Sequence, residues 1–82
     1  MVGVDKSSPY RSWLIESIIA IDNEIGLSDA NKLLIMVSLD TEDKIERFKG
    51  WLKSKVENGK FCATESQIAH AVSYIGQGIY DF

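Results

Sequence analysis

The chain has 82 residues, of which 45% are hydrophobic and 26% charged, and these fractions are typical of a globular domain. The formal net charge of −3 argues against general polyanion binding, because the field of the whole molecule repels phosphate. No stretch approaches the roughly 18 apolar residues of a membrane-spanning helix, and residues 1–8 do not form a secretory signal. The single cysteine, Cys62, excludes an intramolecular disulfide and favours a reducing compartment. We therefore expect one cytoplasmic domain over 1–82, with 1–7 as a flexible N-terminal arm.

Residues typical of helix ends divide the chain into segments of helical length. Pro9 suits the first position of a helix, where its missing N–H costs nothing. Ser28 and Thr41 suit N-caps, because their side chains accept hydrogen bonds from the first turn. Thr64 and Gln67 have the spacing of a capping box. The pattern predicts an all-α fold without a sheet, a compact four-helix bundle-like domain with helices over about 9–25, 29–39, 42–58 and 65–77.

The first predicted helix has more apolar residues than one buried face requires. A stripe with spacings of three and four predicts its inner face, and its members are Tyr10, Trp13, Leu14, Ile18, Ile21 and Ile25. Ile15 and Ile19 lie off this stripe, one turn apart. A helix that is apolar over most of its circumference is either central in the fold or covered by another molecule.

The second predicted helix contains an apolar run, 33–37, without a polar break. Periodicity does not distinguish a buried helix from a buried strand in such a run, but the chain has no second β-rich segment to pair with a strand. We assign the inner face to Ala30, Leu33, Leu34 and Val37. Ile35, Met36 and Leu39 are then left on the outer side.

The third predicted helix is amphipathic and ends at Asn58-Gly59. Its stripe consists of Ile45, Phe48, Trp51, Leu52 and Val56. Residues 44–60 carry a local charge of +4 from six cations and two acids, whereas the rest of the chain is acidic. Two interpretations remain open: a solvated helix face with i,i+4 pairs (Asp43 with Arg47 and Lys53 with Glu57), or a basic docking patch.

The fourth predicted helix pairs an apolar stripe with a row of small residues. The stripe is Ile68, Ala71, Val72 and Ile75, and the small residues Ala69, Ser73 and Gly76 permit another helix to approach closely. The apolar tail of Ile79, Tyr80 and Phe82 either folds back or reaches outward. Across the four helices we predict this core: Trp13, Leu14, Ile18, Leu34, Phe48, Leu52, Val72 and Ile75.

The sequence contains no catalytic or cofactor-binding constellation. Cys62 and His70 are the only soft metal ligands, whereas a zinc site needs about four ligands in compact spacing. The same two residues lack a third group to orient them as a nucleophile and base. We therefore expect neither enzymatic activity, nor a metal, nor a cofactor.

Two short segments resemble a known family. Ser38-Leu39-Asp40-Thr41 precedes an amphipathic helix, and 67–75 forms part of a last helix. Both resemble acyl and peptidyl carrier proteins, small acidic four-helix bundles in which a serine at the start of the second helix carries phosphopantetheine. The resemblance implies that Ser38 would be the attachment site. Val37 stands where that family has an aspartate, and the helix that follows is basic.

The surplus of apolar residues predicts a non-enzymatic protein-interaction module, such as a small bacterial or phage regulator or inhibitor. We expect either a homodimer or a complex with a distinct protein. The predicted contact residues are Ile15, Ile19, Ile35, Met36 and Leu39. The alternatives are the carrier-like protein and a helix-turn-helix protein that binds nucleic acid through 42–58; nucleic acid is the less favoured partner because the molecule is acidic.

Overall fold

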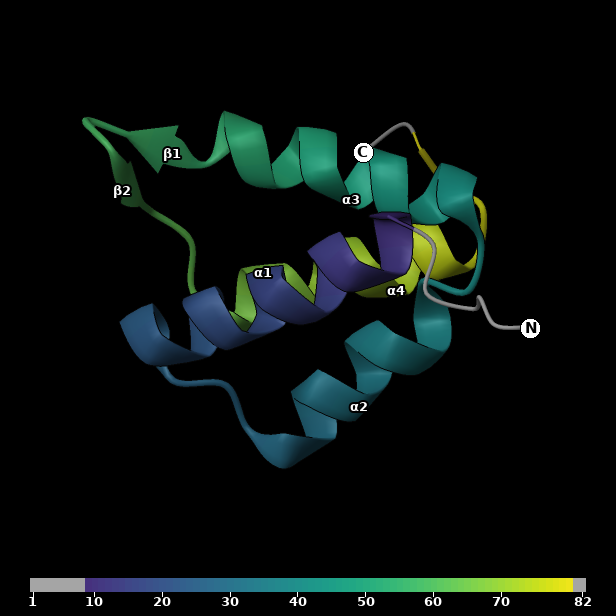
Figure 1. The fold of residues 1–82 in the computed structure, drawn as a ribbon, viewed down its shortest axis with the longest axis horizontal. Helices are drawn as coiled ribbons and strands as arrows, with labels where there is room; N and C mark the ends of the chain where they lie inside the picture. Colours follow the sequence, from purple (N-terminus) through teal and green to yellow (C-terminus); the bar gives the residue numbers. More distant parts are fainter. Residues whose placement is uncertain (1–8, 81–82) are drawn as a thin grey trace.

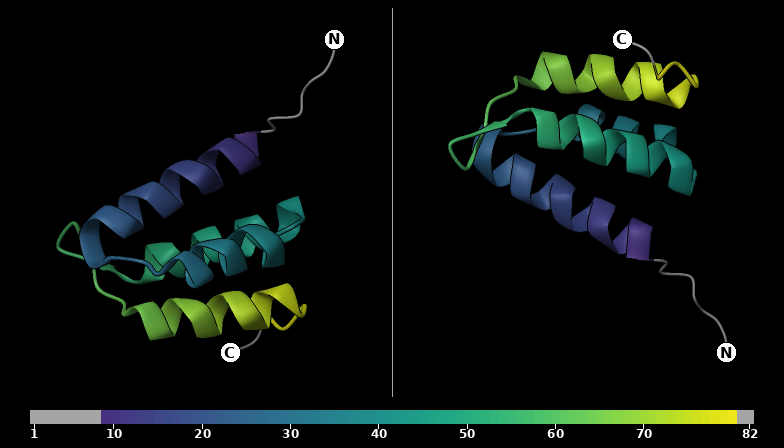
Figure 2. Two further views of the ribbon diagram at one scale, coloured as in Figure 1. Left: turned by 90° about the horizontal axis from the view of Figure 1, so that it is seen from below. Right: turned by 90° about the horizontal axis from the view of Figure 1, so that it is seen from above.

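The computed structural model describes residues 9–80, so the predicted arm over 1–7 lies outside the described residues. It contains four helices and one short hairpin (Figure 1), which are α1 (Pro9–Ile25), α2 (Asp29–Ser38), α3 (Glu42–Ser54), β1 (Val56–Glu57), β2 (Lys60–Phe61) and α4 (Glu65–Gly76). The predicted all-α class is confirmed. Successive helices run in opposite directions, and α2 and α3 lie between α1 on one side and α4 on the other (Figures 1 and 2).

The helices begin where their capping residues predict. The Thr64 hydroxyl accepts a hydrogen bond from the Gln67 backbone N–H at 3.2 Å, and the Thr64 N–H donates to the Gln67 side chain at 2.9 Å. This reciprocal pair is the predicted capping box. Ser28 and Thr41 each accept a bond from the backbone N–H three residues further on. These side chains satisfy donors that the first turn of each helix leaves without a partner.

The predicted end of the third helix and the predicted absence of a sheet are wrong. Helix α3 ends at Ser54, and the chain then forms an antiparallel hairpin in which Val56 pairs with Phe61. Asn58 and Gly59 form its two-residue loop with φ values of +55° and +77°. Positive φ at both loop positions matches the right-handed twist of the strands, and Asn-Gly is the dipeptide that adopts it most readily. The prediction that Asn58-Gly59 ends a helix is therefore wrong.

The hydrophobic core lies between the four helices. It consists of Leu14, Ile18, Ile21, Leu27, Ile35, Leu39, Ile45, Phe48, Leu52, Ile68, Val72 and Ile75. Six of the eight predicted core residues belong to it, whereas Trp13 and Leu34 are half-buried at its edge. Tyr80 also packs against the core, and a hydrogen bond to Asp43 raises the pKa of its hydroxyl. The tail therefore folds back at Tyr80, and Phe82 lies outside the described residues.

The predicted inner face of the second helix is wrong. Ile35 and Leu39, which had been assigned to the outer side, are 1% and 0% exposed. Leu33 and Val37, which belong to the predicted inner face, are 64% and 65% exposed. The unbroken apolar run does not determine which side of the helix turns inward. Contacts with neighbouring helices determine that orientation instead.

One of these contacts is the close approach of α2 to α4. A Cβ atom at Gly76 would lie 2.9 Å from the Cβ of Ser38 and 3.6 Å from its Cα. The two helices therefore approach each other closely at a glycine and a serine. The prediction that Gly76 permits a close helix approach is confirmed. With Ser38 against α4, Ile35 lies one turn earlier on the same side of α2 and is buried.

Candidate functional site

Four large apolar side chains are exposed on α1 and α2. Ile15 and Ile19 of α1 are 44% and 56% exposed, and Leu33 and Val37 of α2 are exposed even more. We call these four residues the α1–α2 face. Isolated exposed apolar side chains are common on protein surfaces, so their significance depends on whether the four lie together.

Polar contacts between the two helices show which sides of α1 and α2 face each other. The Arg11 guanidinium donates to the Leu39 carbonyl at 3.0 Å and to the Met36 carbonyl at 3.4 Å. At the other end, the Lys32 Nζ lies 2.9 Å from the Asp22 carboxylate. Ile15 lies one turn after Arg11, on the side of α1 that carries both contacts.

The same helical geometry places all four exposed residues on one side of the pair. Ile19 lies further from the α2 contact than Ile15, on the side away from the core. Leu33 and Val37 follow Lys32 and Met36 by one residue each, which turns them away from the core by about 100°. Because α1 and α2 run in opposite directions (Figure 1), these two displacements point to the same side. The four residues of the α1–α2 face therefore lie on the same side of the helix pair.

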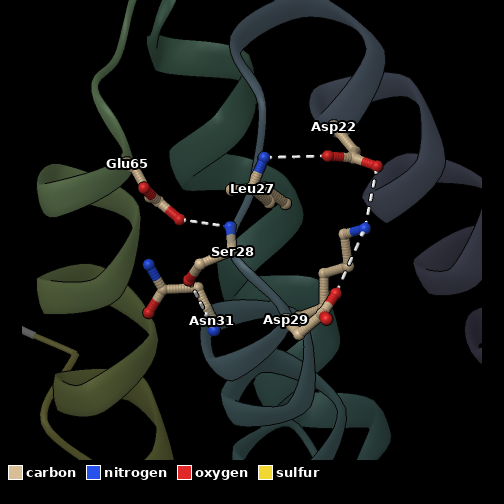
Figure 3. Close-up of polar contacts among 7 residues, drawn as sticks. Asp22, Leu27, Ser28, Asp29, Asn31 and Glu65 are labelled. Carbon is tan, nitrogen blue, oxygen red and sulfur yellow. Dashed lines mark hydrogen bonds and ion pairs between the residues drawn. The ribbon is translucent and has the colours of Figure 1, made fainter.

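The turn between α1 and α2 fixes the relative position of the two helices (Figure 3). The Asp22 carboxylate accepts a hydrogen bond from the Leu27 backbone N–H at 2.8 Å and also contacts Lys32. The Leu27 N–H and then the Lys32 ammonium lower the pKa of Asp22, and Asp22 in turn raises the pKa of Lys32. The turn is thus held by a charged group from each helix.

A second contact joins this turn to α4. The Ser28 backbone N–H donates to the Glu65 carboxylate (Figure 3). This N–H, together with the side chains of Asn31 and Ser28, lowers the pKa of Glu65 below its ordinary value. Glu65 is the first residue of α4, so its charge also faces the positive end of that helix.

The structure changes the set of candidate contact residues. Ile15 and Ile19 are exposed, as predicted, whereas Ile35 and Leu39 are core residues and are removed from the candidate surface. Met36 is half-buried and packs against the core. Leu33 and Val37 take their place, and the unbroken run 33–37 gave no signal that would have selected them.

The structure does not bring the two candidate metal-binding or reactive side chains, Cys62 and His70, together into a site. Cys62 is exposed after the hairpin, with its Sγ 3.5 Å from the Lys60 carbonyl. His70 is exposed on α4, where its ring stacks on Tyr74. Within residues 9–80, no group of three or more His, Cys, Asp or Glu residues could hold a metal ion. In the same range, no helix has the length and apolar content needed to cross a bilayer.

The basic segment uses several of its cations within the fold. The Arg47 guanidinium lies 4.6 Å from the Tyr80 ring centroid, and Lys55 lies 5.6 Å from that of Trp51. The two predicted i,i+4 ion pairs are absent among the described residues, whose ion pairs join Lys44 to Asp40 and Lys32 to two aspartates. The cations Arg47, Lys49 and Lys53 therefore lie on an exposed side of α3 that these two ion pairs do not join.

The possible attachment serine lies at a helix contact. Ser38 is the last residue of α2, it is half-buried, and its Cβ faces Gly76 of α4. Comparison of the chain with protein-family models, with curated proteins and with solved structures returned no match.

Proposed function

We propose that this protein is a non-enzymatic protein-interaction module, with its helices arranged as a small bundle that presents the α1–α2 face to a second copy of the chain. The observation that supports this function is the exposure of four large apolar side chains on one side of the helix pair: Ile15, Ile19, Leu33 and Val37. The largest exposed apolar patch of a protein is often a functional contact surface. Twofold pairing of one patch with itself is the commonest way to cover such a surface.

The size of the two helices indicates how tight this dimer would be. Helix α1 has 17 residues and α2 has 10, which correspond to lengths of about 25 Å and 15 Å. With a width of about 10 Å per helix, the outer sides of the two helices, of which the face is a part, cover about 400 Å². A standard stable interface buries about 800 Å² per partner. We therefore expect a weak dimer whose population rises steeply with protein concentration.

The charges at the two ends of the face favour an antiparallel pairing of copies. Arg11 lies at one end, and Asp29, whose side chain is fully exposed, lies at the other. A twofold axis that lies in the interface and crosses the helices at right angles exchanges the ends of the face, so Asp29 of one copy would approach the Arg11 end of the other. Opposite charges at the rim of an interface contribute to orientation and association rate more than to affinity.

Sedimentation velocity over a range of concentrations tests this proposal. The average mass should rise from 9.2 kDa towards about twice that value as concentration increases. Ile19→Glu and Leu33→Glu should remain folded, because both side chains are mostly exposed, and should stay monomeric. Ile79→Glu is the matched control, since Ile79 is 42% exposed outside the face and its variant should dimerise like the wild type. A wild-type mass that stays at 9.2 kDa at every concentration would refute the homodimer.

A further inference from the structure

A second apolar surface lies on the other side of α1, between α1 and α3. It is an open groove of about 400 Å³, closed at one end by the β1–β2 hairpin. On α1 its lining runs from Trp13 through Ala20 to Glu24, and on α3 it includes Leu52. None of the residues of the α1–α2 face lines it. The groove is therefore a separate candidate site with its own occupant.

The floor of the groove is apolar and belongs to the folded structure. Ile21 and Leu52 are core residues whose edges reach the groove, and Trp13 and Phe61 are half-buried beside them. The hairpin that carries Phe61 is fixed to α1, because the Phe61 backbone N–H donates to the Glu24 carboxylate at 3.1 Å. The groove is thus formed before any ligand binds, which lowers the entropic cost of binding.

The charge at the rim of the groove is asymmetric. Lys49 and Lys53 line it from α3, one turn apart, and both are exposed. The Lys49 Nζ lies 5.5 Å from the Trp13 ring centroid, so this ammonium group reaches across the groove. The acid that lines the groove, Glu24, already accepts the hydrogen bond from the hairpin. An occupant therefore meets an apolar floor with two lysines along the α3 edge and one carboxylate, Glu24, on the α1 side.

We propose that this groove binds an amphipathic helix of a partner protein, with its apolar side against the floor and acidic residues along the α3 edge. The lining from Trp13 to Glu24 spans twelve residues of α1, or about 17 Å from the first to the last, which is about three turns of a docked helix. Binding of a helix in an apolar groove uses anchors at i, i+3 or i+4, and i+7. Acidic residues one turn apart on the docked helix match the spacing of Lys49 and Lys53.

The test uses the full chain and two peptide pools of about 14 residues. In the patterned pool, leucines occupy one helix face and the flanking positions vary among Glu, Gln and Lys; in the scrambled pool, the same residues have no apolar face. Selection on the immobilised protein should enrich the patterned pool, with Glu along one flank. Enrichment of neither pool, or of patterned peptides without a preference for Glu, would refute the proposal.

Variants locate the binding of the best selected peptide. Ala20→Arg places a long side chain in the groove and should weaken binding at least about tenfold, as should Lys53→Glu. Ala30→Arg is the matched control, since Ala30 is exposed on α2 outside the groove, and it should change affinity less than about twofold. The indole N–H resonance of Trp13 should shift on titration in the wild type. Equal affinity in Ala20→Arg would place the peptide elsewhere and refute the proposal.

Competition with two other anionic ligands distinguishes a peptide site from a lipid or nucleic-acid site. A long-chain fatty acid and a mixed-sequence DNA duplex are each offered in competition with the selected peptide. Neither should displace the peptide at concentrations comparable to its own. Displacement by either ligand, together with loss of that ligand's binding in Ala20→Arg, would show that the groove is a lipid or nucleic-acid site and would refute the proposal.

Discussion

The contact between α2 and α4 implies that replacing a helical glycine with alanine has opposite effects on stability at two positions. The substitution should destabilise the protein at Gly76 and stabilise it at Gly50. Gly76→Ala places a methyl group 2.9 Å from the Ser38 Cβ, whereas relaxed carbon contacts lie at about 3.5–4.0 Å. Ser38 offers a Cβ and backbone there, not a flexible side-chain end, so the helices must move apart. Gly50→Ala, in the middle of α3, meets no atom within 4 Å.

The expected magnitudes follow from these distances. Overpacking costs about 1–3 kcal/mol, and the gain in helix propensity from glycine to alanine is at most about 1 kcal/mol. We expect Gly76→Ala to lower the free energy of unfolding by about 1–2 kcal/mol and Gly50→Ala to raise it by about 1 kcal/mol. Thermal melts resolve this difference, because about 1 kcal/mol shifts the melting temperature of such a small domain by about 4–8 °C.

The pairing of Gly76 with Ser38 has its own control. In a Ser38→Gly background the nearest carbon is removed, so adding Gly76→Ala should cost little or should stabilise the protein. If Gly76→Ala alone stabilises the protein as much as Gly50→Ala does, α2 and α4 do not approach as closely as described, and the explanation for the orientation of α2 is wrong.

Three further predictions concern the core, the turn and Ser38. Phe48 is 0% exposed, so Phe48→Ala should lower the free energy of unfolding by about 3–5 kcal/mol in urea denaturation; an unchanged midpoint would show that α3 is wrongly oriented. The pKa of Glu65 is lowered from 4.5, chiefly by the Ser28 N–H. The ionised Glu65 carboxylate therefore stabilises the folded state above about pH 4.5, and this contribution is lost as pH falls through the lowered folded-state pKa. Melting temperatures measured on acidification should therefore fall less steeply for Glu65→Gln than for the wild type, and identical slopes would contradict this contact. Finally, a broad-specificity phosphopantetheinyl transferase with coenzyme A should add no group to Ser38, because its side chain packs against α4; intact mass spectrometry showing one added arm would support the carrier-like alternative.

Local chemistry predicted most of the helix boundaries. Caps such as Ser28 and the Thr64 box depend on residues within one turn of each other, so the sequence contains the whole interaction. The hairpin was equally local, since Asn58-Gly59 is a strong hairpin signal, but the apolar stripe through Val56 suggested that the helix continued. The predicted helix is too long because its apolar periodicity continues through residues whose turn chemistry favours a hairpin.

The candidate surfaces depended on contacts that no local pattern contains. Ile15 and Ile19 could be assigned to an outer face because a regular stripe already defined the inner face of α1. No such reference existed for Leu33 and Val37, whose exposure follows from the contact of Ser38 with Gly76 about 40 residues later in the chain. The α1–α3 groove likewise exists because Phe61 returns over α1 to meet Glu24.

We propose that a second copy covers the α1–α2 face in solution. The most direct test is the relaxation that a soluble paramagnetic probe causes at individual methyl groups, measured at low and at high protein concentration. We predict that relaxation at the Ile19 and Leu33 methyl groups falls as concentration rises, while relaxation at Ile79 stays constant. Equal relaxation at both concentrations for Ile19 and Leu33 would show that the face remains open to solvent and would contradict the claim.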